Sequence, residues 1–380
     1  MAGEARTALA SSIQKWGKKF NSQTNAEMVD LITKIHELEG KDYSGVGVEK
    51  GIRYGGDDER QRLDIYYPKG ATPESKLPVV IFFHGGGMVF GDTDVTPLFH
   101  SNIGTYPFSH NPPSSSPPSL ATSLSPHLTP LPQGKFLATN STILISATYR
   151  LLPKAAHPSG AIDASLAISW AITNSPRYGG CPATSLTVIG HSAGGSCIGT
   201  ALWGGFLDKN PRPIVKGNEE EKSDEWEAII TNSTFIFLSA GLWYDVDNPP
   251  TSINMPKYHR TEDKERIRRE MPVALLREVV ERQKRESREG KYEGEKGWRG
   301  PKMRFFLGEW EFEEIVKGTE GCEGVWEEGF GGEDEDGAGG LDVEMVWGEN
   351  HVSYVYGIGM EGSWISERLL EIVKGEQKKE

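Results

Sequence analysis

The sequence predicts an α/β fold in which helices cover both faces of a mostly parallel eight-stranded sheet. Wholly apolar runs such as Val79–Phe83 are typical of central strands that are buried on both faces. Helical and strand patterns alternate along most of the chain, as where 158–174 separates two apolar runs. Glycine-rich motifs directly follow two of the predicted strands, at 84–87 and 190–195.

The elements follow one another in a regular order. The first 40 residues are predicted to be helical, because apolar side chains between Met28 and Leu38 recur at spacings of three and four. We expect residues 1–44 to form a helical cap segment and residues 45–380 to form the α/β domain. The predicted strands are 45–54, 62–67, 79–83, 141–149, 187–190, 233–239, 302–307 and 342–347, and a helix over 363–378 follows them.

Two segments interrupt this pattern. Residues 106–134 are rich in proline and serine and have little to bury, so we expect them to be disordered, whether as a genuine insert or as retained intron sequence. Residues 245–300 form a second insertion, in which Lys264–Glu289 is dense in charge and carries a partial apolar stripe. Its position before the last two strands favours a lid over a site, and a plain surface helix is the alternative.

Composition excludes several classes of protein. The chain of 380 residues has a formal net charge of -13, which disfavours binding to nucleic acid. No secretory signal and no apolar stretch of about 18 residues is found, so we expect a cytoplasmic protein without stable membrane insertion. The oligomeric state stays open. Three cysteines fit neither a disulfide framework nor a metal site: Cys181, Cys197 and Cys322.

The segment Gly190–Gly194 (GHSAG) fits the Gly-x-Ser-x-Gly pattern of a nucleophile elbow. It stands between a predicted strand and a predicted helix, where a sharp turn lifts the serine hydroxyl clear of the sheet. Flanking glycines are needed because side chains would collide in such a turn. We therefore interpret Ser192 as a catalytic nucleophile, and a glycine-rich turn without chemistry is the alternative.

The segment His84–Gly87 (HGGG) follows another buried strand. A tetrahedral intermediate of acyl transfer carries an oxyanion that needs two or three preorganised N–H donors. Glycines allow the backbone to approach that oxygen without a Cβ atom in the way. We expect Gly85, Gly86 and Ala193 to be the donors, and a loop kept only for tight packing is the alternative.

Together these segments resemble the hormone-sensitive-lipase-like branch of the α/β-hydrolases. The resemblance is carried by His84–Gly87, by Tyr149–Pro153 (YRLLP) with Asp163, and by Gly190–Gly195 (GHSAGG). It implies a carboxylesterase-type fold with an N-terminal helical cap and no cofactor. It also implies that short- to medium-chain acyl esters are the substrates.

The general base should be a histidine, which can accept the serine proton near neutral pH. In this fold the chain order is serine, acid, histidine, and His351 follows the last predicted strand, so it fits the final position. His84 and His191 lie inside the glycine motifs, where local hydrogen bonding is their expected role. The other six fall in the proline-rich insert or outside the loops that should top the sheet: His36, His100, His110, His127, His157 and His259.

The triad acid should follow the strand at 302–307, where the sequence reads Gly308–Glu314 (GEWEFEE). The resemblance places Glu311 where the family has an aspartate, and Phe312 where a proline usually follows it. A glutamate can also hold the imidazole tautomer and stabilise the imidazolium. Glu309 and Asp245 remain alternatives, and a run of glutamates can simply begin a surface helix.

These residues predict a serine hydrolase that cleaves carboxylic esters without a metal or cofactor. Two other functions stay open. The same residues could hydrolyse an amide or formamide, as in an arylformamidase. The fold could also serve as a non-catalytic ligand-binding protein, because some hydrolase folds lose their catalytic role.

Overall fold

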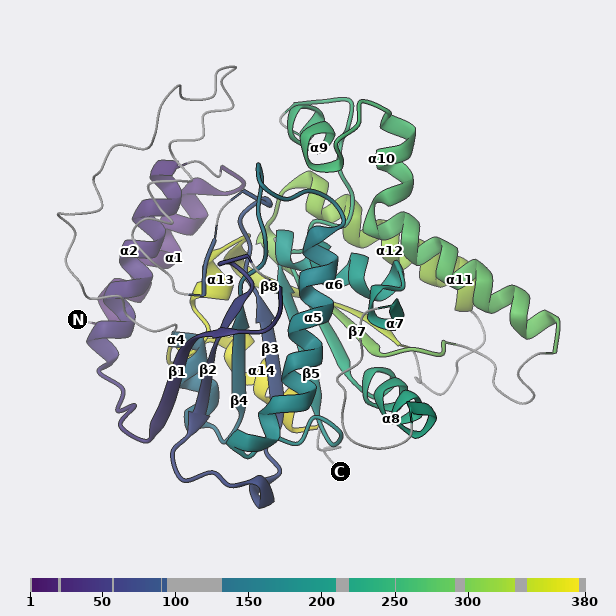
Figure 1. Ribbon diagram of the computed structural model, residues 1–380. Helices are drawn as coiled ribbons and strands as arrows, with labels where there is room; N and C mark the ends of the chain where they lie inside the picture. The colour runs from purple at the N-terminus through teal and green to yellow at the C-terminus, as the bar shows by residue number, and fades with distance from the viewer. Residues whose placement is uncertain are drawn as a thin grey trace.

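The sheet of the computed structural model has eight strands in the order β1-β2-β4-β3-β5-β6-β7-β8 (Figure 1). The strand β2 runs antiparallel to both of its neighbours, and all other pairs from β4 to β8 are parallel. The predicted fold class is confirmed. The strands are β1 (Val46–Arg53), β2 (Arg62–Pro68), β3 (Val79–Phe83), β4 (Ile143–Ala147), β5 (Leu186–His191), β6 (Thr234–Leu238), β7 (Lys302–Trp310) and β8 (Leu341–Asn350).

The structure describes most of the chain in separate stretches. These are residues 2–19, 22–56, 58–89, 91–93, 132–209, 219–249, 251–290, 298–331 and 340–375. None of the helices in these stretches is long and apolar enough to cross a bilayer.

Burial of the central strands explains their wholly apolar sequence. In β3, Val79, Ile81 and Phe83 belong to one apolar core, whereas Val80 belongs to a second core on the other face. Successive side chains of a strand point to opposite faces, so a strand covered on both sides needs apolar residues throughout.

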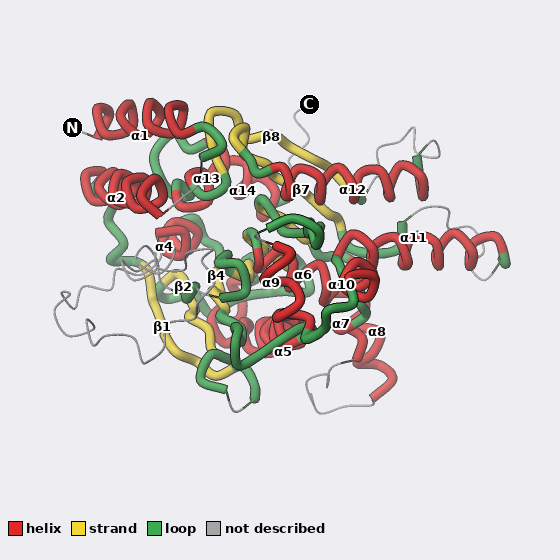
Figure 2. Tube along the Cα trace, turned by 90° about the horizontal axis from the view of Figure 1, so that it is seen from above, coloured by secondary structure: helices red, strands yellow, loops and turns green. Residues whose placement is uncertain are grey.

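Two layers of helices supply those cores (Figure 2). One face is covered by α5 (Ser159–Asn174), α6 (Ala193–Trp203), α8 (Glu219–Thr231), α11 (Pro272–Arg288) and α12 (Glu313–Phe330). The other is covered by α4 (Pro132–Thr139), α13 (Ser353–Tyr356) and α14 (Trp364–Lys374). Short elements η1 (Pro73–Ser75), η3 (Ser175–Tyr178) and α7 (Phe206–Lys209) complete the connections.

The N-terminal segment forms two helices, α1 (Ala2–Trp16) and α2 (Ser22–Glu39), which lie side by side (Figure 2). Their apolar stripes, which include Ile13 and Met28, form a third core. That core also contains Val352, which follows β8, and Trp310 at the end of β7 packs against it. The two helices therefore support the segments that follow the last two strands.

The predicted proline-rich insert lies, for residues 106–131, outside the described residues. Its last three residues form the first turn of α4, so the insert ends before Pro132 rather than at residue 134. The reason is packing: Gln133 is buried and donates to the Val355 carbonyl at 2.9 Å, and Leu137 enters the second core.

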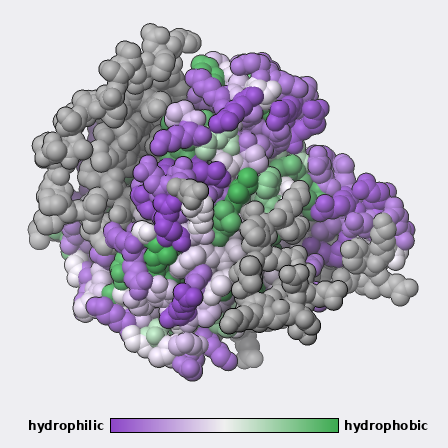
Figure 3. All heavy atoms as spheres, in the orientation of Figure 1, coloured by the Kyte–Doolittle hydropathy of each residue, from purple (hydrophilic) through white to green (hydrophobic). Residues whose placement is uncertain are grey.

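The insertion at 245–300 contains three described helices, α9 (Thr251–His259), α10 (Lys264–Glu270) and α11. Residues 250 and 291–297 of it lie outside the described residues. In Figure 1, α9 and α10 lie beyond the carboxyl ends of the parallel strands, at the top of the view. The helix α11 packs against α6 and α12 through Leu276, Val279 and Val280. Its outer surface, on the right of Figure 3, is mainly hydrophilic.

Candidate active site

Ser192 occupies the turn between β5 and α6 with φ 50° and ψ -116°, a strained backbone conformation for a residue with a side chain. Space around this turn is very small. A Cβ atom on Gly194 would lie 2.2 Å from the Phe83 carbonyl oxygen, and one on Gly190 would lie 2.7 Å from the backbone of Gly194. The flanking glycines are thus required by backbone contacts between β3, β5 and α6, as expected from the motif.

His351 directly follows β8, and its ring lies between Ser192 and Glu311. Its Nε2 atom is 3.0 Å from Ser192 Oγ, and its Nδ1 atom is 2.8 Å from Glu311 Oε1. Both members of the pair are buried, with exposures of 7% for His351 and 1% for Glu311. The three residues that the sequence predicted as nucleophile, base and acid are therefore in contact.

Hydrogen bonds hold both oxygens of the Glu311 carboxylate. The backbone N–H of Phe312 donates to Oε1 at 2.9 Å, and the Ser239 hydroxyl bonds to Oε2. Ser239 in turn contacts the Tyr354 hydroxyl at 2.7 Å. Burial, and then the nearby Glu311 charge, raise the pKa of Tyr354 well above its usual value, so it stays a neutral hydrogen-bonding group.

Phe312, which stands where the resemblance leads one to expect proline, packs against His351. The ring centroids of Phe312 and His351 are 4.9 Å apart. The alternative acids lie elsewhere. Glu309 accepts the Gly348 N–H at 2.8 Å, and Asp245 accepts bonds from the segment just after it. Among the described contacts of His351, the carboxylate partner is Glu311.

Two of the expected oxyanion donors, Gly85 and Ala193, adjoin Ser192. Gly85 packs closely on it: an added Cβ atom would lie 3.1 Å from Ser192 Cβ and 2.7 Å from His191 Nδ1. Ala193 is the first residue of α6, and Gly86 has φ 131°, which favours glycine. Among the described residues, no backbone acceptor is found for the N–H groups of Gly85, Gly86 and Ala193.

Two side chains orient the peptides that carry the first two of these donors. The Tyr149 hydroxyl donates to the His84 carbonyl at 2.7 Å, and the His84 ring Nδ1 bonds to the Gly85 carbonyl at 2.7 Å. In a trans peptide the N–H points away from the carbonyl of the same unit. Tyr149 therefore orients the N–H of Gly85, and the His84 ring orients that of Gly86.

The buried Asp163 holds the segment around Tyr149 in place. It is fully buried and accepts hydrogen bonds from the Arg150 guanidinium at 2.8 Å, from the Arg150 N–H at 2.8 Å and from Gln61 at 2.8 Å. A buried carboxylate is tolerated when it is paired and hydrogen-bonded in this way. Asp163 thus fixes the loop after β4 rather than taking part in the reaction.

Sequence reasoning missed the long-range role of His191. Its Nε2–H donates to the His351 carbonyl at 2.9 Å, so it holds the backbone of a residue 160 positions later. Burial, and then the neighbouring His351, lower the pKa of His191 to about 3, so its ring is neutral. His84 does make the local hydrogen bond that was expected of it.

A separate group of possible metal ligands is formed by His157, His259 and Glu270. The sequence analysis does not expect chemistry from either histidine, because both lie outside the loops predicted to top the sheet.

No model of a known protein family matches the chain. Esterase LipI of Mycobacterium tuberculosis is 27% identical over 151 residues, which cover 40% of this chain and 36% of that protein. Probable carboxylesterase 8 of Arabidopsis thaliana is 28% identical over 147 residues, covering 36% of this chain and 35% of that protein. The chain thus spans about a third of the length of these curated relatives.

Solved structures agree over almost the whole chain. Esterase B of Lactobacillus rhamnosis superposes with a TM-score of 0.56 at 14% identity, covering 98% of this chain and 96% of that one. The chain has the α/β-hydrolase fold. The carboxylesterase EstE1, cloned from a metagenomic library, gives a TM-score of 0.52 at 14% identity, and the superposition covers 93% of this chain and 95% of that one. At such identities the agreement concerns the fold.

Proposed function

We propose that this α/β-hydrolase cleaves carboxylic esters of short to medium acyl chains, with Ser192 as nucleophile, His351 as base and Glu311 as acid. The observation that carries the proposal is the unbroken series of contacts from Ser192 Oγ through the His351 ring to the Glu311 carboxylate, at 3.0 and 2.8 Å. The names of the similar curated proteins support the same reaction class.

In the proposed reaction, Ser192 Oγ attacks the acyl carbon while His351 Nε2 takes its proton. Glu311 keeps the Nδ1–H tautomer in place and stabilises the imidazolium that forms. His351 then gives the proton to the leaving alcohol. Water, activated by the same nitrogen, releases the acyl group from Ser192. No step in this scheme requires a metal or cofactor.

The oxyanion of each tetrahedral intermediate would be bound by the N–H groups of Gly85, Gly86 and Ala193. Two of them are preoriented by Tyr149 and His84, and the third lies at the first turn of α6. Preorganised donors cost little reorganisation during the reaction, and loss of one typically lowers the rate about 100- to 1,000-fold.

We further propose that residues 1–44 and the α9–α10 part of 245–300 cap the substrate pocket, above a catalytic domain of residues 45–380. The core of α1 and α2 includes Val352, next to His351. The helices α9 and α10 lie beyond the carboxyl ends of the parallel strands (Figure 1), and Ser192 directly follows the carboxyl end of β5. The acyl group would therefore sit under these segments, and its permitted length would depend on them.

The test compares wild type and Ser192→Ala on p-nitrophenyl acetate, butyrate and octanoate. We expect turnover by wild type and a loss on the order of 1,000-fold or more in the variant, because the nucleophile is missing. Ser185→Ala is the matched control, since Ser185 lies at the opposite end of β5, where it donates to the Val373 carbonyl at 2.9 Å. It should keep full activity.

Two results would contradict the proposal: a folded wild type that hydrolyses none of these esters, or equal rates for wild type and Ser192→Ala. Parallel kinetics on p-nitroanilides and on an aryl formamide would separate an esterase from an amidase or formamidase. An esterase should prefer the esters by a wide margin, because the leaving amine needs firmer protonation than the leaving alcohol.

A further inference from the structure

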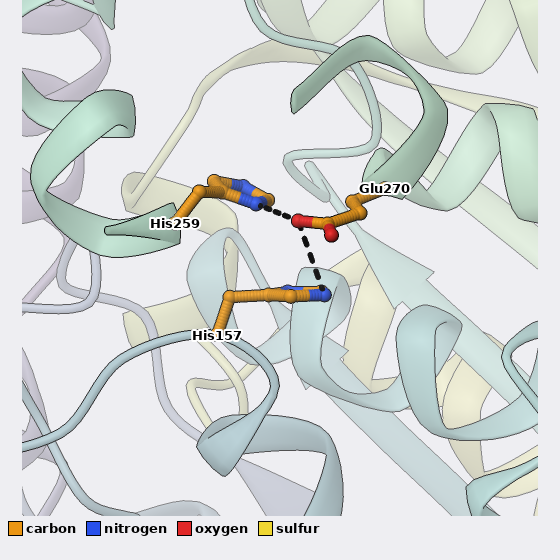
Figure 4. Close-up of side chains that lie close together, drawn as sticks. All are labelled: His157, His259 and Glu270. Atoms are coloured by element: carbon orange, nitrogen blue, oxygen red, sulfur yellow. Dashed lines mark hydrogen bonds and ion pairs between the residues drawn. The ribbon is translucent and has the colours of Figure 1, made fainter. Parts of the chain in front are cut away.

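Three side chains of metal-binding type meet outside the Ser192 site (Figure 4). His157 precedes α5, His259 is the last residue of α9, and Glu270 is the last residue of α10. One ligand atom from each lies within 4.8 Å of the other two. The group joins the insertion helices to the body of the domain. No sequence motif predicts this group of residues, because they come from three separate elements.

The geometry is close to that of a metal site. Glu270 Oε2 is 2.7 Å from His259 Nδ1 and 3.9 Å from His157 Nε2. In a tetrahedral zinc site with bonds of about 2.0–2.1 Å, ligand atoms lie about 3.4 Å apart. The two observed distances bracket that value. The separation from His157 is too long for a hydrogen bond, so its ring points at the carboxylate without bonding to it.

The two rings are held in a common orientation. Their centroids are 4.5 Å apart with planes 22° from parallel, and both present a nitrogen to the same side (Figure 4). The backbone N–H of His157 donates to the Tyr258 carbonyl at 2.8 Å, and this bond connects the two segments that carry the histidines. Such preorganisation reduces the conformational cost of binding an ion.

The residues around the three side chains also suit a metal site. Arg266 Nε is 2.8 Å from Glu270 Oε1, so the guanidinium holds one oxygen and leaves Oε2 facing the rings. Partners of this kind commonly orient ligating carboxylates. The exposed side-chain fraction rises from 1% for His259 through 12% for His157 to 25% for Glu270, so an ion could enter from the Glu270 side.

We propose that His157, His259 and Glu270 bind one Zn²⁺ ion, with a fourth position left to water. Two imidazoles and one carboxylate are a ligand set that zinc accepts. The ion would bridge α9, α10 and the segment before α5, and so fasten the insertion to the domain. This role is independent of the ester hydrolysis proposed above and needs no catalytic residue.

The experiment uses the full-length protein after removal of bound metal with a chelator, and titrates it with Zn²⁺ by calorimetry. We expect one equivalent to bind and the melting temperature to rise with Zn²⁺ concentration, as it must for a ligand of the folded state. His259→Gln and Glu270→Gln should each weaken binding by roughly 100-fold or more, because each loses a direct ligand.

Two controls separate this site from other histidines. His36→Gln changes a histidine of α2 that bonds to the Tyr356 carbonyl at 3.1 Å, and it should keep the affinity for Zn²⁺. His351→Gln removes the histidine beside Ser192, and it should also keep the affinity. Loss of binding in His351→Gln with retention in His259→Gln would place the ion at Ser192 and overturn the proposal.

A second measurement keeps the proposal testable if the His259 or Glu270 variants fail to fold. X-ray absorption of the wild-type Zn²⁺ protein should show two imidazoles and oxygen ligands, and the same spectrum should be obtained from His351→Gln. Absence of stoichiometric binding by wild type would also overturn the proposal. His259 and Glu270 would then form a metal-free hydrogen-bonded pair beside His157.

Discussion

Two histidine–glutamate contacts of nearly equal length lie in very different surroundings. His351 Nδ1 is 2.8 Å from Glu311 Oε1, and His259 Nδ1 is 2.7 Å from Glu270 Oε2. The far nitrogen of the first ring meets the Ser192 hydroxyl, whereas that of the second is buried without a hydrogen-bond partner among the described residues. The pair itself therefore does not define a function. What differs is the third group, which is a serine hydroxyl at the far nitrogen of His351 and a second imidazole, that of His157, on the carboxylate beside His259.

The two carboxylates differ as well. Glu311 is 1% exposed, and its second oxygen bonds to the buried Ser239. The Glu270 side chain is 25% exposed, and its second oxygen faces the guanidinium of Arg266. A fully enclosed carboxylate suits a fixed orienting role, whereas an open one beside two imidazoles suits an exchangeable ion.

The largest expected effect is that of Glu311→Gln. The amide is nearly isosteric but carries no charge and can favour the wrong tautomer of His351, so kcat on p-nitrophenyl butyrate should fall on the order of 10,000-fold. The matched control is Glu309→Gln, two residues earlier, where Oε2 accepts the Gly348 N–H. It should change kcat less than about threefold. A large loss of kcat in Glu309→Gln with none in Glu311→Gln would show that Glu309, and not Glu311, is the acid.

A smaller effect concerns a third imidazole that supports the active-site pair. His191 is 4% exposed, its pKa is lowered to about 3, and it faces His351 and His84. A histidine whose pKa is lower in the folded state takes up its proton on unfolding, so its contribution to stability is lost as pH falls from about 6.5 towards 3. Between pH 7 and pH 5 this amounts to about 2 kcal/mol.

Urea unfolding of wild type and His191→Gln at the two pH values measures this effect. Glutamine can still donate to the His351 carbonyl but does not titrate, so the loss of unfolding free energy between pH 7 and pH 5 should be about 2 kcal/mol smaller in the variant. An equal loss in both proteins would mean that His191 gains no proton on unfolding in this range.

Much of the fold could be predicted because the strands are strongly apolar. The strand expected at 79–83 is β3 itself, and the strand expected at 302–307 begins where β7 begins. The secondary structure of the insertion at 245–300 was harder to predict. Its charged stretch suggested one helix, but the structure divides it into α10 and α11 at Met271. Pro272 was the available signal, since proline disfavours a helical residue before it and suits the first turn of a new helix.

Within the site, the local motif indicated Ser192 and the chain order indicated His351, whereas Glu311 followed from the family resemblance, with Glu309 and Asp245 as alternatives. The contacts that depend on tertiary structure could not be foreseen in this way. His191 bonds to a residue 160 positions away, and the ligand atoms of His157, His259 and Glu270 converge from three elements. Periodicity and spacing in a sequence reflect local structure. Contacts between residues that lie far apart along the chain therefore leave no pattern in a single sequence.

The smallest expected effect tests whether the Glu270 carboxylate is held less firmly than the Glu311 carboxylate. Arg266 is 52% exposed in its side chain and pairs with Glu270 four residues later on the same helix. Pairs of this kind contribute about 0.3–0.5 kcal/mol. Arg266→Gln should therefore lower the unfolding free energy of the metal-free protein by no more than about 0.5 kcal/mol in urea unfolding. A loss of about 2 kcal/mol is typical of a buried charged hydrogen bond. Such a loss would show that Glu270 is held as firmly as an enclosed carboxylate, and the contrast with Glu311 would disappear.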